Sequence, residues 1–164
     1  MKALVITNDS TVFRYKEASA EEMFGGRVTE VRNLKRRVYE ICETSFGIVS
    51  GKYGFISGDR VISKYDEVPD SEAGYKELQE RTDFPAWISM VSEQYDFVLI
   101  FVPKEMMRLI MKEDLKGKII ASTSLEFKEE FQRRGWMFCE RKGARVGKKN
   151  ADGIVSELLS FSSP

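Results

Sequence analysis

Carboxylates that follow short apolar runs are the best candidates for chemistry in this sequence. Asp9 follows the first apolar run of the chain. Asp66 ends the polar loop that follows another apolar run, residues 47–49. A carboxylate in such a position can act as a general base that activates water, and this role does not need a histidine. The sequence therefore predicts Asp9 and Asp66 as candidate catalytic residues.

The loop that precedes Asp66 carries residues suited to ligand binding. The ammonium group of Lys52 can hold an anion, and the ring of Tyr53 can stack on a base or donate a hydrogen bond. A packed tyrosine and a solvated lysine would give the same sequence without a ligand, so both interpretations stay open. The candidate ligand-binding residues lie at or near the ends of apolar runs: Ser50, Lys52, Tyr53, Gly54, Tyr65, Ser122 and Thr123.

The composition excludes several kinds of site. The chain has no histidine, and its two cysteines are Cys42 and Cys139. The missing histidine removes the commonest general base and metal ligand, so we expect no Ser-His chemistry, no metal and no cofactor. Lysine plus arginine and aspartate plus glutamate balance at 26 each, so the net charge favours no class of partner.

Nothing in the apolar pattern predicts contact with a membrane. The longest apolar run, residues 97–102, is far shorter than the roughly 20 residues that span a bilayer, and no signal peptide precedes the first strand. Two unpaired cysteines fit a reducing compartment. We therefore expect a cytoplasmic protein without a membrane partner, and the sequence leaves the oligomeric state open.

Apolar periodicity predicts the elements that position the candidate residues. Amphipathic segments between short apolar runs indicate helices that alternate with strands, which favours a mostly parallel sheet with helices on both faces. We expect a single α/β domain over residues 1–164 with Rossmann-like three-layer architecture. The expected strands are residues 2–7, 47–49, 96–102, 118–121 and 136–139.

In a parallel sheet the carboxyl ends of the strands lie along one edge. Asn8 to Ser10, Ser50 to Gly54 and Ser122 to Ser124 would then lie together with Pro103 and Lys104. Small polar residues also serve as turns and helix caps, so Asp9 either completes a turn or faces a ligand. The same two interpretations apply to Ser122 to Ser124.

Weaker periodicity leads to three local predictions. Residues 27–31 are expected to form a short strand. Asn33 is expected to cap a helix that runs from Leu34 and carries Cys42. Thr123 has capping-box spacing to Glu126 before the next helix.

A basic loop near the end of the chain is the main alternative site. Glycines at positions 143 and 147 would let its backbone approach phosphates. A solvated turn gives the same pattern, and no aromatic residues interleave with the basic ones to stack bases. The candidate nucleic-acid-binding residues are Arg141, Lys142, Arg145, Lys148 and Lys149.

The segment from Ser50 to Phe55, followed by Asp59, Ile62 and Tyr65-Asp66, resembles the signature of the YaaA-like group. That group also includes small uncharacterised "SAKYG" domains. Lys64 stands where the family pattern has proline. The resemblance implies a role connected with nucleotides or nucleic acid.

Two hypotheses follow from these residues. The first is an enzyme that acts on a nucleobase or nucleotide at the carboxyl edge of the sheet. The second is a protein that binds RNA or DNA without chemistry through the loop from Arg141 to Lys149. The expected partner is accordingly a nucleotide-like small molecule or a nucleic acid.

Overall fold

The computed structural model, which describes residues 1–162, confirms the predicted α/β fold. Its main sheet has the order β4-β3-β1-β6-β7-β8, and every neighbouring pair is parallel except β3 and β4. The strands of this sheet are β1 (Lys2–Asn8), β3 (Glu43–Ser50), β4 (Gly54–Ser57), β6 (Phe97–Phe101), β7 (Lys118–Thr123) and β8 (Met137–Glu140).

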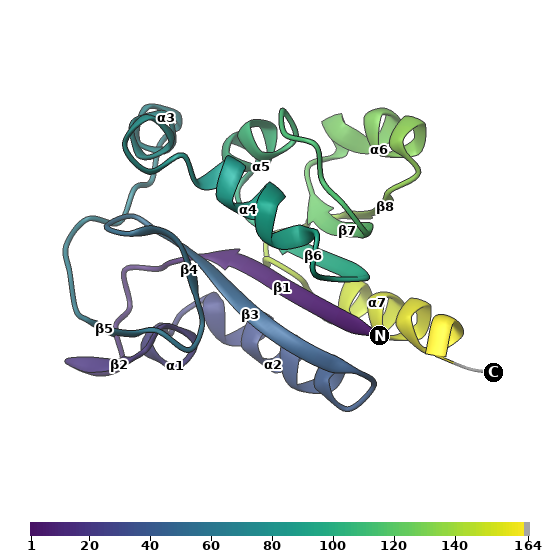
Figure 1. Ribbon diagram of the computed structural model, residues 1–164, viewed down its shortest axis with the longest axis horizontal. Coiled ribbons are helices and arrows are strands. Elements are labelled where there is room, and N and C mark those ends of the chain that lie inside the picture. The colour runs from purple at the N-terminus through teal and green to yellow at the C-terminus, as the bar shows by residue number, and fades with distance from the viewer. Residues whose placement is uncertain (163–164) are drawn as a thin grey trace.

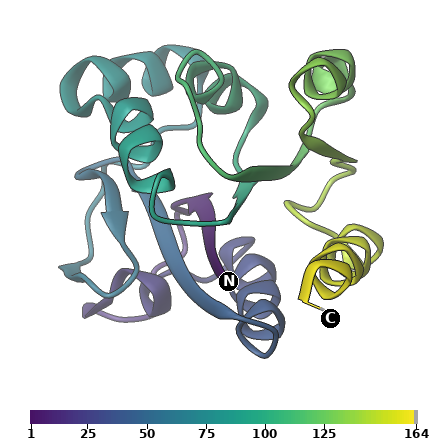
Figure 2. The same cartoon turned by 45° about the vertical axis from the view of Figure 1, so that its right-hand side comes forward.

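Helices cover both faces of the sheet (Figure 1). The strand residues alternate between the two layers: Ala3 and Val5 belong to one core, and Leu4 and Ile6 to the other. One layer contains α1 (Ala20–Met23), α2 (Val28–Tyr39) and α7 (Lys148–Ser162), and Figure 2 shows α7 beside α2. The opposite layer contains α3 (Glu72–Thr82), α4 (Phe84–Ser92), α5 (Lys104–Ile110) and α6 (Lys128–Arg134).

The strand order creates a topological switch point between β1 and β6. The chain leaves β1 through α2 and enters β3 on one side, whereas it leaves β6 through α5 and enters β7 on the other. Connections that diverge in this way open a crevice outside the carboxyl ends of the two strands, where doubly wound sheets bind ligands. In this chain the crevice lies beyond Asn8 and Phe101.

Helix α2 differs from the sequence prediction. Residues 27–31 do not form a strand, because Val28 and Val31 share the buried helix face of Leu34. The helix therefore begins at Val28, and Asn33 lies in its interior instead of capping it. Cys42 lies in a bend between the helix and β3 instead of on the helix.

The predicted capping box after β7 is also wrong. Thr123 is the last residue of the strand, and Ser124 caps the short 3₁₀ helix η1 (Leu125–Phe127) by accepting a hydrogen bond from the Glu126 N–H. A two-stranded antiparallel sheet was not foreseen either. Its strands β2 (Glu17–Ser19) and β5 (Val61–Ser63) are too short to show a clear alternation.

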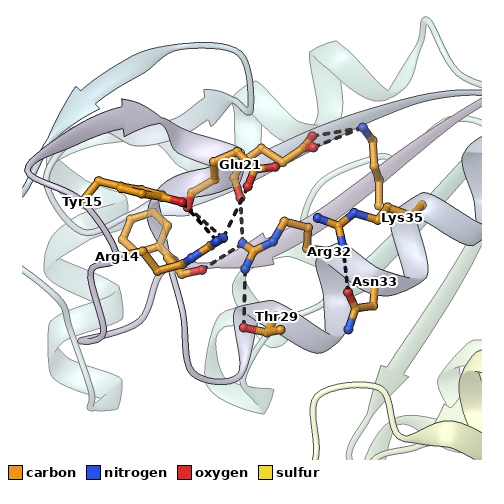
Figure 3. A network of polar contacts seen from close by, with 10 residues as sticks. Arg14, Tyr15, Glu21, Thr29, Arg32, Asn33 and Lys35 are labelled. Carbon is orange, nitrogen blue, oxygen red and sulfur yellow. Dashed lines mark hydrogen bonds and ion pairs between the residues drawn. The ribbon is translucent and has the colours of Figure 1, made fainter.

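A buried arginine joins α1 to α2 (Figure 3). Arg32 is 3% exposed, and its Nη1 donates to the carbonyl oxygens of Glu21 and Phe24, each at 2.8 Å. These carbonyls lie within and just after α1, and Arg14 donates to the two between them, those of Glu22 and Met23. Arg32 and Arg14 thus share the carbonyls of this helix end.

We expect Arg32→Ala to lower the free energy of unfolding by about 3 kcal/mol, because it leaves the buried carbonyl of Phe24 and the partly buried one of Glu21 without a charged donor. Urea denaturation followed by circular dichroism measures the change. Arg36→Ala is the matched control, since Arg36 is exposed and bonds only to the side chain of Asn33. Equal stability of the two variants would contradict this role of Arg32.

Candidate functional site

Asp9 lies at the switch point, directly after β1. Its side chain is buried, and its Oδ2 accepts two hydrogen bonds, from the Gly51 N–H at 2.7 Å and from the Tyr65 hydroxyl at 2.6 Å. The Asp9 N–H donates to the carbonyl of Val49 at 3.1 Å. One carboxylate oxygen therefore joins β1 to the two segments that follow β3 and β5.

A chain of hydroxyl groups leads to this carboxylate. The Ser50 hydroxyl donates to the Tyr65 oxygen at 2.9 Å, and Tyr65 donates to Asp9. The backbone N–H groups of Lys52 and Tyr53 donate to Ser50 Oγ at 3.2 and 3.1 Å. All donors in this chain are directed toward Asp9, so each bond polarises the next.

The loop after β3 is held close to its neighbours at Gly51. A Cβ atom at this position would lie 1.8 Å from the carbonyl oxygen of Glu67, so only glycine fits. Arg81 on α3 fixes the loop from outside, because its guanidinium donates to the carbonyls of Gly51 at 2.7 Å and of Lys52 at 3.0 Å. The N–H of Gly51 is thus held in position for Asp9.

Arg145 reaches the same place from the loop after β8. The residue is 7% exposed, and its Nη1 donates to Thr7 Oγ1 at 2.8 Å and to the carbonyl of Asn8 at 2.6 Å. Its Nη2 donates to the carbonyl of Asp9 at 2.9 Å. The guanidinium therefore fixes the end of β1 and brings a positive charge near the Asp9 carboxylate.

Burial dominates the electrostatics of this group. It raises the pKa of the Asp9 carboxyl from 3.8 to about 6, although the bonds from Gly51 and Tyr65 and the charge of Arg145 oppose the rise. Burial and the nearby Asp9 raise the pKa of Tyr65, which stays neutral and donates. Burial, with repulsion from Arg141, lowers the pKa of Arg145 to about 10, so it stays charged at neutral pH.

Two buried oxygens on the α3 to α6 face have no partner within residues 1–162. They are Asn8 Oδ1, at the end of β1, and Thr123 Oγ1, at the end of β7. Burying a polar atom without a hydrogen bond costs about 1 to 3 kcal/mol, so such atoms are rare in proteins. Their position at strand carboxyl ends is the position at which this fold binds ligands.

The structure separates the remaining candidates from Asp9. Asp66 is exposed on the rim of a hollow of about 400 Å³ that also borders Gly51 and Arg81. Lys52 is exposed, and the half-buried ring of Tyr53 lies 6.0 Å from the ring of Tyr65.

Gly54 and Ser122 have structural environments. Gly54 begins β4 with a φ of +78°, where a Cβ atom would lie 2.6 Å from the side chain of Thr82. Ser122 faces α7, and its oxygen accepts from the amide of Asn150 at 3.4 Å. Neither residue contacts the Asp9 carboxylate.

The five basic residues predicted for one loop do not share one surface, and Lys148 and Lys149 are the first residues of α7 instead of loop residues. Arg145 is buried, and half-buried Arg141 donates to the carbonyl of Val102 at 2.8 Å. Lys142, Lys148 and Lys149 remain exposed around a hollow of about 460 Å³. The two arginines therefore belong to the sheet edge, and the three lysines to the outer surface.

The described part of the chain contains no cluster of three metal-ligating side chains. Within residues 1–162 no helix is long and apolar enough to cross a membrane.

The comparisons with known proteins add no further constraint. The chain matches no protein-family model, no curated protein and no solved structure.

Two residues of the site have no clear signal in the sequence. Arg81 lies among acidic residues on a helix, a pattern typical of a solvated face. Thr7 belongs to the first strand, and nothing local predicts that Arg145 bonds to it. Such contacts join residues distant in the chain, so only the fold reveals them.

We expect Asp9→Asn to stabilise the protein at neutral pH. The folded Asp9 carboxyl holds its proton more tightly than the unfolded one, so its stability contribution is complete below about pH 4 and is lost as the pH rises through about 6. Asparagine keeps an acceptor for Gly51 and Tyr65 and never ionises. The gain relative to the wild type should approach about 3 kcal/mol at pH 8 and vanish near pH 4.

Urea unfolding of both proteins at pH 4, 6 and 8 measures this difference. Asp66→Asn makes the same chemical change at an exposed position and should follow the wild type at each pH. A variant Asp9→Asn that is less stable than the wild type at pH 8 would show that the ionised carboxylate stabilises the fold.

Proposed function

We propose that this protein is an enzyme that acts on a nucleotide-like small molecule, with Asp9 as its general base. One observation carries the proposal: a buried carboxylate with a pKa of about 6 lies at the switch point of a doubly wound sheet. Strongly shifted carboxyl groups in such crevices are typical of catalytic sites. At neutral pH Asp9 is mostly ionised and can accept a proton.

The neighbours of Asp9 support this role. Both of its side-chain hydrogen bonds end on Oδ2, so Oδ1 carries neither of them. Tyr65 and Gly51 thereby fix the orientation of the carboxylate while one oxygen is left to accept the proton. A base that is held in position before the ligand arrives loses little entropy in the reaction.

Asp66 fits the role of base less well than Asp9. Its carboxylate is exposed to solvent, whereas that of Asp9 is buried at the switch point. Its position beside the hollow near Gly51 suits a residue that contacts the ligand from the rim.

The class of ligand is inferred from the residues around this carboxylate. The half-buried ring of Tyr53, next to Tyr65, carries the guanidinium of Arg60 at 4.4 Å from its centroid, and a stacked base would take the place of that cation. The resemblance to the YaaA-like group favours the same class. Ser50 and Lys52 belong to the loop that carries this resemblance.

A panel of nucleobases, nucleosides and nucleoside 5′-monophosphates, analysed by chromatography after incubation, tests the proposal. We expect turnover of at least one compound, with an acid limb in the pH profile near pH 6. Asp9→Asn should reduce the rate by about 100-fold or more, because it removes the base. Tyr65→Phe removes a bond that favours the ionised form, so the acid limb should move to higher pH.

Asp70→Asn is the matched control for this experiment, because Asp70 is exposed and lies outside the site, and it should stay within a few-fold of the wild type. Retained turnover in Asp9→Asn would rule out Asp9 as the base. A larger loss in Asp66→Asn than in Asp9→Asn would transfer the role to Asp66.

A second candidate function rests on the exposed lysines. Lys128 joins Lys142, Lys148 and Lys149 around the hollow of about 460 Å³, and Glu140 is the one carboxylate that lines it. Clustered lysines attract the phosphates of RNA or DNA and release counterions on binding. The protein would then bind nucleic acid without chemistry.

The double variant Lys148→Gln/Lys149→Gln tests this second candidate. Loss of two phosphate contacts should reduce the slope of log affinity against log salt by about 1.5 in anisotropy titrations of labelled RNA and DNA. Lys76→Gln/Lys112→Gln makes the same charge change at exposed positions elsewhere and should leave the slope unaltered. Equal slopes in all three proteins would exclude binding through these two lysines.

A further inference from the structure

Two guanidinium groups bond to neighbouring strand ends at the switch point, close enough for Arg141 to repel the charge of Arg145. Arg145 donates to the carbonyl of Asn8, and Arg141 donates to the carbonyl of Val102. Because Thr7 pairs with Phe101, the residues that follow them, Asn8 and Val102, end neighbouring strands at the same level. Adjacent strands are about 5 Å apart, so the two positive charges lie near each other, one at the end of β1 and the other at the end of β6.

Neither charge is neutralised by direct contact. Within residues 1–162 no carboxylate forms an ion pair with Arg141 or Arg145, and the two guanidinium groups donate to carbonyl and hydroxyl oxygens. A guanidinium has five N–H groups. Arg141 uses one of them in these bonds and Arg145 uses three, so donors remain on both.

The carboxylates in the neighbourhood act at longer range. Asp9 and Glu30 act on Arg145, and Glu30 and Glu105 act on Arg141. Glu30 is engaged elsewhere, since its Oε1 accepts from the N–H of Val146 at 2.8 Å. Asp9 accepts from Gly51 and Tyr65. None of these carboxylates is in direct contact with the guanidinium group of Arg141 or Arg145.

The unpartnered oxygens border the same crevice. Asn8 lies at the same level as Val102, because Thr7 pairs with Phe101. Thr123 lies at that level too, because Ala121 pairs with Ile100 and both Thr123 and Val102 come two residues later. Asn8 Oδ1 and Thr123 Oγ1 thus lie on the strands that flank β6, both buried and without a partner among the described residues. The threonine hydroxyl can donate to an anion, and the asparagine oxygen can accept from a ligand hydroxyl.

We propose that Arg141 and Arg145 bind a phosphate group of the ligand at the switch point. Arginine forks match phosphate oxygens in pairs, and guanidinium groups already held by carbonyls lose little freedom on binding. This inference deepens the proposed function, because it identifies the substrate as a phosphate ester. It rests on the proposed function in one respect: the molecule whose phosphate binds the two arginines is the molecule that reacts at Asp9. The phosphate would occupy the β6 side of the crevice and the reacting part the Asp9 side.

Isothermal titration with inorganic phosphate at constant ionic strength tests the proposal without any reaction. Wild-type protein should bind phosphate saturably, and Arg141→Gln should weaken binding by about tenfold or more, the effect of one charge-assisted hydrogen bond. Lys142→Gln makes the same charge change at the next residue, which is exposed, and should stay within about twofold of the wild type. Asp9→Asn should retain binding.

These variants distinguish the outcomes. Absence of saturable binding, or equal binding by Arg141→Gln and the wild type, would overturn the proposal. A larger loss in Lys142→Gln would overturn it too and place the anion on the surface lysines. Arg141→Lys, which keeps the charge but not the fork, should give an intermediate loss and replaces Arg141→Gln if that variant unfolds. Phosphate binding is measured without any reaction, so it can succeed even if Asp9 is not the general base. The failure of one proposal can therefore be told from the failure of the other.

Discussion

The buried guanidinium of Arg145 is the interaction on which the carboxyl edge of this sheet depends. It donates to three oxygens of Thr7, Asn8 and Asp9 at the end of the central strand β1, between 2.6 and 2.9 Å. A charge removed from water to this extent is tolerated because fixed dipoles replace its hydration. The same charge opposes the effect of burial on Asp9, so the guanidinium helps to set both the shape and the acidity of the edge.

A second constraint acts through one oxygen atom. Asp9 Oδ2 accepts hydrogen bonds from the Gly51 N–H and the Tyr65 hydroxyl. Three separate segments of the chain therefore have to lie within hydrogen-bond distance of one another. The loop at Gly51 has no room for a side chain, and Arg81 holds its carbonyls from the opposite side. The donors are therefore fixed in place before any ligand arrives, which is the property expected of a site that stabilises charge.

The sequence predicts the layers of this fold better than its details. Apolar runs identify the central strands because burial on both faces leaves no polar interruption, as from Phe97 to Val102. Asp9, Ser50 and Tyr65 were predicted as site residues, and the hydrogen bonds bring these three together. The start of α2 was missed because Val28 and Val31 fit a strand as well as a helix over so short a range.

The inward direction of Arg141 and Arg145 lay beyond sequence analysis, since basic residues between glycines look the same whether they face water or a sheet. Their contacts are with residues 39 and 136 to 138 positions earlier in the chain. Local periodicity carries no information over such separations.

The late position of Arg145 links the last part of the chain to the ionisation of Asp9. Gly51 and Tyr65, which hold the Asp9 carboxylate, come before β6, whereas the guanidinium that opposes the effect of burial comes only with the loop after β8. Because the charge of Arg145 favours the ionised form of Asp9, docking of this loop and loss of the Asp9 proton favour each other. Completion of the edge is therefore a proton-linked step.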